Sequence, residues 1–359
     1  MSEQLTTETI GKKLCRERVM LVGGGGFIGH NLSLELRNYG IEVMVVDNLM
    51  LNNLVTNVSE FDLDPLRRTL NHGFLMDRFE MMRDAGVVMR NVDARTMGDL
   101  TEAFYDFSPT KIVHLSAIAS SVEARETPGH CFDLQLITLR NVMELCRVYK
   151  IVNQVVLFSS STVYGDFETP TVDETVRPRP RGIYANTKFM AERLVRTYAH
   201  QYGTGSTIVR PSALYGERCV SRRVSQVFIE NALLGKPLLL EGGGDGRLDF
   251  TYIQDLADGV VRALAAHEGP GTTNTFNMTF GDARSIADLA AIVKSVVPDA
   301  ILEDRPRDKE KPVRGTLSTK RAEEELGFKP QWPLEKGYRQ YCEWYVGQFE
   351  RAQRKIKSN

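Results

Sequence analysis

The sequence is poor in cysteine and tryptophan, with five cysteines and two tryptophans in 359 residues. The cysteines are odd in number and none is spaced as in a CxxC motif, which argues against a disulfide framework and against a zinc site. They are Cys15, Cys131, Cys146, Cys219 and Cys342. We therefore expect reduced thiols and no structural metal.

An excess of charge of one sign is also missing. The 45 Lys and Arg side chains are balanced by 46 Asp and Glu, and the two signs are interspersed. This balance argues against the basic stripe typical of nucleic-acid binding and the basic helix typical of membrane-surface binding. Residues 1–14 are polar, unlike a signal peptide, and no apolar run is long enough to span a bilayer. We expect a cytoplasmic enzyme that binds neither nucleic acid nor membrane.

The sequence does contain a regular alternation of short apolar runs and helical patterns. This alternation predicts an α/β fold, a Rossmann-type doubly wound parallel sheet. The predicted strands are 19–22, 41–46, 86–89, 111–115, 155–159 and 206–210, and the predicted helices include 32–40, 100–104, 132–149 and 184–202.

After residue 210 the elements become shorter and Gly and Pro denser. We predict a first domain at 15–210 and a smaller C-terminal α/β lobe at 211–350 that binds substrate, with a segment at about 250–280 that returns to the first domain or stays in the lobe. The stretch 165–181, rich in Pro and Arg, is expected to form a long surface loop over a site.

A glycine-rich turn, Gly23-Gly24-Gly25-Gly26-Phe27-Ile28-Gly29, joins the first predicted strand to a helix. Glycines here permit a tight turn and let the backbone approach a pyrophosphate, while the helix start supplies free N–H groups; by itself such a run is also typical of a flexible turn. Asp47 ends the next strand, at about the 20-residue separation expected of the acid that holds the adenosine ribose hydroxyls. A carboxylate there repels a 2′-phosphate, which favours NAD over NADP. Asp93 is either an acceptor for the adenine amino group or a helix N-cap.

Tyr184 and Lys188 form a YxxxK pattern, which on a helix places both side chains on one face. A nearby ammonium favours the phenolate of a phenol whose ordinary pKa is about 10, so Lys188 is suited to activate Tyr184 as a base. The same spacing also occurs by chance on amphipathic helices. The hydroxyl residues 159–162 follow a predicted strand, where ligands of open α/β sheets bind, although a polar strand exit also explains them.

Together and in this order, these motifs make the chain resemble the extended short-chain dehydrogenase/reductase family, in its nucleotide-sugar epimerase and dehydratase branch. The resemblance runs from about Arg18 to Tyr345 and includes HLSA at 114–117, SSSTVYG at 159–165, RPSALYG at 210–216, DFTYIQD at 249–255 and the segment 318–330. It implies that 15–210 is an NAD-binding Rossmann domain and that the substrate is a nucleotide-diphosphate sugar. It also implies a homodimer formed by the helices of 132–149 and 184–202.

The resemblance assigns roles to individual residues. Its catalytic serine or threonine lies three positions before the Val of VYG, which is Ser160, and Tyr184 and Lys188 match the base and its partner. Arg307 stands where related epimerases place an arginine on the substrate diphosphate, or is an exposed surface arginine. The residues expected to bind NAD are Gly23, Gly26, Phe27, Ile28, Gly29, Asp47, Asn48, Asp93, Ala94, Leu115, Ser116, Ala117, Tyr184, Lys188 and Pro211. The residues expected to bind substrate are Ser161, Thr162, Ala213, Arg218, Arg247 and Arg307.

The reaction type within this family depends partly on the two residues after the catalytic serine. The 4,6-dehydratases carry Asp-Glu there as acid and base, whereas this chain has Ser161 and Thr162. This favours 4-epimerisation through a transient 4-keto sugar. Two alternatives stay open: dehydration or another 4-keto chemistry that uses acids from the lobe (Glu174, Glu217 or Cys219), and a non-catalytic NAD-binding scaffold.

The chain also departs from the family pattern. Ala213 replaces an Asn that contacts substrate, and Leu248 replaces an Arg, with Arg247 displaced by one position. Gln135 and Leu317 replace a common Asn and Asp. The segment 49–90 is longer than usual and contains a Met-rich helix candidate around 79–82, which suggests core, an added lid or a partner contact.

Overall fold

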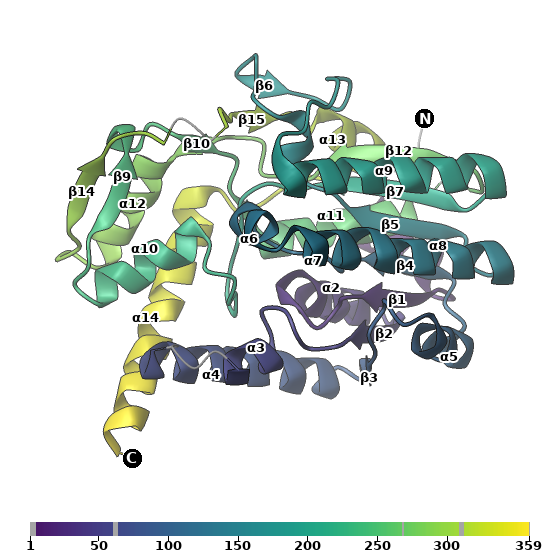
Figure 1. Cartoon of the computed structure of the whole chain (residues 1–359), viewed down its shortest axis with the longest axis horizontal. Helices are drawn as coiled ribbons and strands as arrows, with labels where there is room; N and C mark the ends of the chain where they lie inside the picture. Colours follow the sequence, from purple (N-terminus) through teal and green to yellow (C-terminus); the bar gives the residue numbers. More distant parts are fainter. Residues whose placement is uncertain (1–4, 60–63, 268, 309–311, 359) are drawn as a thin grey trace.

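The computed structural model describes residues 5–59, 64–267, 269–308 and 312–358. A seven-stranded parallel sheet in the order β12-β7-β5-β4-β1-β2-β3 lies at its centre (Figure 1). The chain crosses from one side of β1 to the other after β3, which is the doubly wound arrangement and confirms the expected α/β fold. The strands are β1 (Arg18–Val22), β2 (Glu42–Asp47), β3 (Val88–Asn91), β4 (Lys111–His114), β5 (Gln154–Phe158), β7 (Gly205–Arg210) and β12 (Thr273–Asn277).

Helices cover both faces of this sheet. Val19 and Leu21 of β1 enter the same hydrophobic layer as side chains of α2 (Phe27–Asn38) and α11 (Ile253–Ala265). Met20 and Val22, which point the other way, pack with α5 (Met97–Phe107), α8 (Thr138–Tyr149) and α9 (Gly182–Tyr202). Burial on both faces explains why the inner strands β1, β2, β4 and β5 are nearly continuous apolar runs in the sequence. The edge strands β3 and β12 are more polar or more exposed.

The predicted helix at 132–149 is divided in the structure. It consists of the end of α7 (Pro128–Phe132), a π-helical turn η1 (Asp133–Ile137) and α8. A short helix α6 (Ser121–Glu126) precedes α7, and both pack against α9. The predicted surface loop at 165–181 contains one short strand, β6 (Thr171–Val172), which pairs with β15 (Thr316–Leu317).

The smaller lobe lies at one side of the sheet (Figure 1). Two of its strands, β9 (Leu238–Glu241) and β14 (Leu302–Arg305), pair in parallel. Its other elements are α10 (Val224–Leu233), η3 (Gly242–Gly244), β10 (Arg247–Leu248), β13 (Arg284–Ser285) and α12 (Ile286–Val296). Between β10 and β13 the chain returns to the large sheet through α11 and β12, which pairs with β7. Two short strands, β8 (Leu214–Tyr215) and β11 (Thr251–Tyr252), pair with each other in a separate two-stranded sheet.

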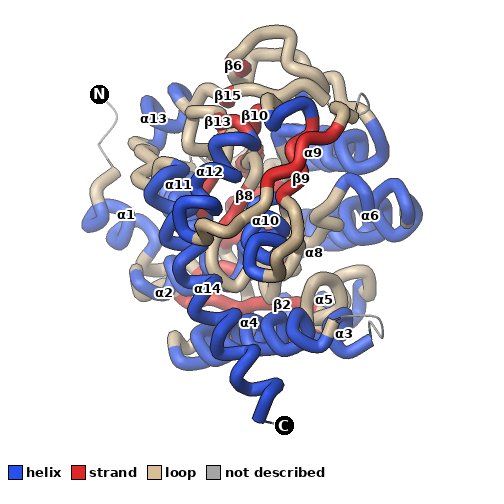
Figure 2. Tube along the Cα trace, turned by 90° about the vertical axis from the view of Figure 1, so that its left-hand side faces the viewer, coloured by secondary structure: helices blue, strands red, loops and turns tan. Residues whose placement is uncertain are grey.

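The long segment between β2 and β3 forms two helices, α3 (Leu54–Ser59) and α4 (Pro65–Asp84). Asp64 caps α4 by accepting hydrogen bonds from the backbone N–H groups of residues 66 and 67. The predicted Met-rich helix is the last part of α4. This helix packs on α2 and on the long C-terminal helix α14 (Leu334–Ser358), which runs beside it in Figure 2. At this contact the Phe74 ring lies 4.9 Å from Trp344 and 5.6 Å from Tyr345, centroid to centroid.

The remaining helices are α1 (Thr7–Leu14), which packs on α11, and α13 (Lys320–Leu326). Within the described ranges, no helix combines the length and the apolar character that a membrane crossing requires. All five cysteines are free thiols; Cys15 is exposed and the other four are buried.

Candidate active site

The glycine turn after β1 is shaped by close backbone packing. A Cβ added at Gly23 would lie 2.6 Å from the Ser116 backbone N, and one added at Gly29 would lie 2.2 Å from the Gly24 carbonyl oxygen. Gly23 also has φ +77°, which favours glycine. Helix α2 begins directly after Gly26, and no described side chain caps its first N–H groups. The turn therefore presents free backbone donors at the positive end of a helix, which fits a pyrophosphate.

Asp47 stands beside this turn at the end of β2. Its carboxylate accepts hydrogen bonds from the backbone N–H of Gly25 (2.9 Å) and of Leu49 (2.7 Å). Burial raises the pKa of Asp47, and these two backbone donors oppose that rise. Further along, Asp93 accepts from Asn48 (3.1 Å) and forms an ion pair with Arg95 (2.6 Å). The hydrogen bonds from Arg95 lower the pKa of Asp93 to about 2.

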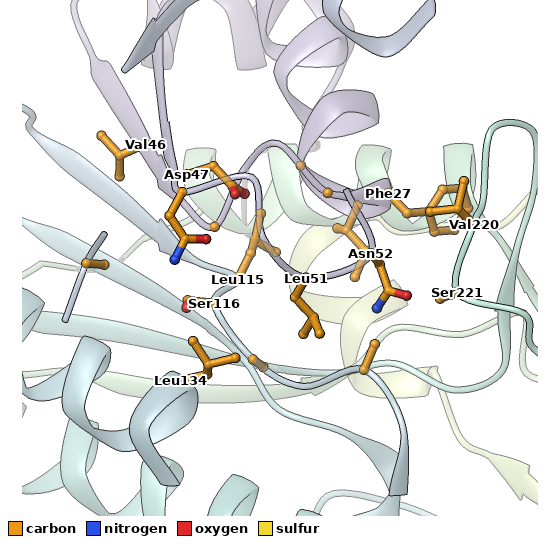
Figure 3. A pocket seen from close by; sticks show the side chains of 18 of the residues that line it. Phe27, Val46, Asp47, Leu51, Asn52, Leu115, Ser116, Leu134, Val220 and Ser221 are labelled. Atoms are coloured by element: carbon orange, nitrogen blue, oxygen red, sulfur yellow. The ribbon is translucent and has the colours of Figure 1, made fainter. Parts of the chain in front are cut away.

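These residues line one elongated pocket. Figure 3 shows Phe27 near Val220 and Ser221 toward one end, and Val46 and Asp47 toward the other. All predicted NAD-binding residues line it except Tyr184, Lys188 and Pro211, which line the neighbouring cavity. The bare glycine turn and the acid beside it fit the pyrophosphate and the adenosine ribose of NAD.

The neighbouring cavity holds the predicted catalytic residues. Ser160, Tyr184 and Lys188 all line it, together with Ser161 and Thr162. The two cavities share five lining residues, Ile28, Leu115, Ala117, Ala119 and Arg223. A dinucleotide in the first pocket can therefore extend toward the catalytic side chains.

The structure separates the three consecutive serines after β5. Ser159 donates a 2.5 Å hydrogen bond to buried Glu192, which is also paired with Arg210 (2.7 Å). Ser160 instead accepts from the Thr162 backbone N–H (3.2 Å) and hydrogen-bonds with Tyr184. Ser159 is thus engaged in a buried ion-pair network, while Ser160 has its hydroxyl at the phenol of Tyr184.

Lys188 lies one turn after Tyr184 on α9. Its ammonium donates a 2.7 Å hydrogen bond to the Phe158 carbonyl and lies 6.0 Å from the centroid of the Tyr184 ring. Burial lowers the pKa of Lys188 to about 8. Burial raises the pKa of Tyr184, and the effects that oppose this rise come from the positive charges of Arg223 and Arg314 and from the Ser160 hydrogen bond. The two arginines were not expected from the sequence.

Three predicted substrate arginines lie outside both cavities. Arg218 points to Asp77 (3.5 Å) and to the Trp344 ring, Arg247 donates to the Ala283 carbonyl, and Arg307 is exposed beside Gly242. Arg307 lies in the segment that follows β14. The other predicted substrate residues, Ser161, Thr162 and Ala213, line the catalytic cavity.

Three arginines that sequence reasoning missed do line the cavities. Arg78 of α4 lines the cofactor pocket, Arg314 lines the catalytic cavity, and Arg223 lines both. Arg314 donates a 2.8 Å hydrogen bond to the Ser161 carbonyl, and burial lowers its pKa to about 10. Each comes from a segment with no recognisable motif, so only the signal of unusual length in 49–90 could have drawn attention to Arg78.

Residues 19–281 match the NAD dependent epimerase/dehydratase family. The chain belongs to this family. UDP-glucuronate 4-epimerase 2 of Arabidopsis thaliana is 26% identical over 356 residues, covering 94% of this chain and 78% of the plant protein. UDP-glucuronic acid decarboxylase 1 of Danio rerio is 26% identical, covering 93% of this chain and 74% of the fish protein.

Among solved structures, UDP-glucose 4-epimerase of Thermus thermophilus, in complex with NAD, superposes with a TM-score of 0.76 at 26% identity. The match covers 92% of this chain and 99% of the bacterial one. The chain is therefore an NAD-dependent enzyme of the nucleotide-sugar epimerase/dehydratase type. NAD, the cofactor expected from the glycine turn and Asp47, is confirmed.

Proposed function

We propose that the enzyme is a 4-epimerase of a nucleotide-diphosphate sugar, in which NAD is regenerated in each turnover. One observation carries this proposal: among the described residues, those that line the catalytic cavity include no Asp, Glu or His. Elimination of water needs an acid and a base besides the tyrosine that oxidises C4. A cavity with only hydroxyls, one phenol, one ammonium and two guanidinium groups supports reversible oxidation and reduction at one carbon.

Tyr184 removes the proton of the C4 hydroxyl, with Ser160 hydrogen-bonded to the same phenol. Bound NAD supplies a hydride acceptor and, in its oxidised form, a positive charge that further favours the phenolate. The resulting 4-keto sugar turns so that its other face receives the hydride, and Tyr184 returns the proton. The reaction is balanced, because the sugar loses and regains one hydride and one proton.

Lys188 and the two cavity arginines adjust the charge around Tyr184. We propose that Lys188 also donates to the nicotinamide ribose, as its place on the same face of α9 favours. Arg223 lies where the two cavities meet and Arg314 lies on the Ser161 side, so both are placed to contact an anionic substrate. We include Ser161, Thr162 and Ala213 in the sugar subsite because their side chains line the same cavity.

Dehydration is the second candidate, and the acids available for it lie elsewhere. Glu174 accepts from the Asn277 backbone N–H (2.7 Å), and Glu217 accepts from the Tyr252 hydroxyl (2.7 Å). Cys219 is buried with its Sγ 3.2 Å from the Ser221 hydroxyl. None of the three lines the catalytic cavity. A non-catalytic scaffold is disfavoured because Ser160, Tyr184 and Lys188 converge on one cavity.

We further propose that the enzyme acts in the cytoplasm as a homodimer that pairs α8 and α9 with their symmetry mates. These helices pack side by side and leave several large apolar side chains exposed, among them Val148 (59% exposed), Met190 (46%) and Tyr202 (50%). Light scattering during gel filtration tests the assembly. A dimer that Met190→Asp converts to a monomer supports it, and a wild-type monomer contradicts it.

The activity is tested by incubating purified enzyme with a panel of UDP- and GDP-sugars and following the sugar signals by NMR. The proposal predicts conversion of one sugar nucleotide to its C4 epimer and an equilibrium mixture from either side. Accumulation of a deoxy-keto sugar, release of CO₂ or net formation of NADH would contradict it. Tyr184→Phe is the control that separates this activity from contaminants.

A further inference from the structure

Arg78 is the largest cation that the structure buries completely, with 0% of its surface exposed. It lies on α4, in the long segment between β2 and β3 that the sequence pattern left unexplained. Its Nε donates a 3.0 Å hydrogen bond to the Arg218 carbonyl, and Nη2 donates to the same oxygen. The third nitrogen, Nη1, has no hydrogen-bond partner among the described residues.

No ion pair joins Arg78 to a carboxylate within the described ranges, in contrast with the buried pair of Arg210 and Glu192. A buried guanidinium without a counter-ion is unfavourable, because the charge has left water and gained no ionic partner in return. The carboxylate that acts on Arg78 belongs to Asp47, and both of its oxygens already accept hydrogen bonds from backbone N–H groups. The protein alone leaves this cation uncompensated.

The position of Arg78 indicates what compensates it. Arg78 lines the cofactor pocket together with Gly26 and Phe27, at the start of α2, and with Val220 and Ser221. Figure 3 shows Phe27 close to Val220 and Ser221. The first N–H groups of α2 have no side-chain cap. A helix start and an unpaired guanidinium that line the same pocket both favour a doubly charged anion.

We propose that Arg78 is the counter-ion of the NAD pyrophosphate and donates to it from Nη1. The segment 49–90 is then part of the cofactor site, because α4 carries the arginine and the aromatic contacts of Phe74 with α14 hold α4 in place. Arg78 is a binding residue and not a residue that moves protons or hydride. The inference rests on NAD as cofactor and does not depend on which sugar is converted.

The test compares Arg78→Met with Arg83→Met, a matched control on the same helix whose side chain is exposed and paired with Asp84. After removal of bound cofactor, the affinities for NAD, ADP-ribose and adenosine are measured by calorimetry or ligand-observed NMR. Loss of a charge-assisted hydrogen bond is expected to weaken NAD and ADP-ribose by about 10- to 100-fold. Adenosine, which lacks phosphate, is expected to bind within about twofold of wild type, and Arg83→Met to change none of the three.

Equal weakening of adenosine and NAD would show that Arg78 only supports the shape of the pocket, and unchanged NAD affinity would exclude the contact; either result overturns the proposal. If Arg78→Met does not fold, Arg78→Lys serves in its place. A lysine keeps the charge but lacks the planar fork whose separate nitrogens face the Arg218 carbonyl and the pyrophosphate, so a loss of about 5- to 20-fold in NAD affinity with unchanged adenosine affinity is expected. A lysine variant with wild-type NAD affinity contradicts the proposal.

Discussion

Replacing Lys188 by methionine is expected to abolish activity and yet stabilise the cofactor-free protein. Burial lowers the pKa of Lys188 to about 8 from its ordinary value of 10.5. At about 1.36 kcal/mol for each pH unit, this difference corresponds to roughly 3 kcal/mol of destabilisation at neutral pH, where the folded protein must carry the charge. Methionine removes that cost but leaves the Phe158 carbonyl without its donor, a loss of about 1 kcal/mol. The net expectation is a gain of about 2 kcal/mol.

The pH dependence of the free energy of unfolding gives a second test of the cost of burying Lys188. Between about pH 8 and 10.5 the unfolded chain retains a proton on Lys188 that the folded protein has released, so the wild-type free energy of unfolding rises with pH in this window. Burial raises the pKa of the Tyr184 phenol above its ordinary value, and Tyr184 is present in both proteins. The Lys188→Met variant lacks this contribution, so the gap between variant and wild type is expected to close from pH 8 upward.

The assay is urea denaturation of both proteins from pH 7 to pH 10 after removal of NAD, because bound cofactor adds its own stability. Other buried lysines titrate in both proteins and cancel in the difference. Two results would contradict a burial cost at Lys188. One is a variant less stable than wild type at pH 7, and the other is a difference in free energy of unfolding that stays constant to pH 10.

Three further substitutions test other parts of the site. Tyr184→Phe is expected to lower kcat by about 10² to 10⁴ while NAD affinity changes little, and an active variant would remove the phenol from the mechanism. Ala213→Gly is expected to raise the free energy of unfolding by about 1 kcal/mol, because Ala213 has φ +34°, a conformation that is strained for a residue with a Cβ. A lower free energy of unfolding for the variant in urea denaturation would contradict this strain. Arg314→Met is expected to weaken nucleotide-sugar binding about 10-fold without affecting NAD, as calorimetry with each ligand would show; equal effects on both ligands would count against a substrate contact.

The parts of the site that the sequence reveals are those built within one turn or one strand end. The glycine turn and Tyr184 with Lys188 each depend on local backbone geometry, so their spacings, taken together and in order, identified residues that line the two cavities. The distinction between Ser159 and Ser160 came from the family resemblance, and the Glu192 contact of Ser159 gives it a physical basis. Six of the seven strands of the central sheet followed from apolar runs. The seventh, β12, was not predicted, because Phe276 is its one apolar residue.

The positively charged groups of the site were not predictable in this way. Arg78, Arg223 and Arg314 reach the cavities from three distant segments, and no pattern around them distinguishes them from arginines on the surface. The expected Arg247 and Arg307 lie instead in the smaller lobe, outside the cavities. The cavity that a long arginine side chain reaches depends on how its helix or loop packs in the folded protein. The spacing of residues within one segment does not contain that information.

The path of the hydrogen at C4 during turnover decides whether the enzyme is a 4-epimerase that regenerates NAD. A nucleotide-sugar substrate that the enzyme converts is prepared with deuterium at C4 and incubated to equilibrium, and the product is examined by NMR and mass spectrometry. 4-Epimerisation predicts that deuterium remains at C4 of the epimer, with no label lost to solvent, because the same hydride leaves and returns. Deuterium at C6 together with loss of water, or deuterium retained in reduced cofactor, would contradict it.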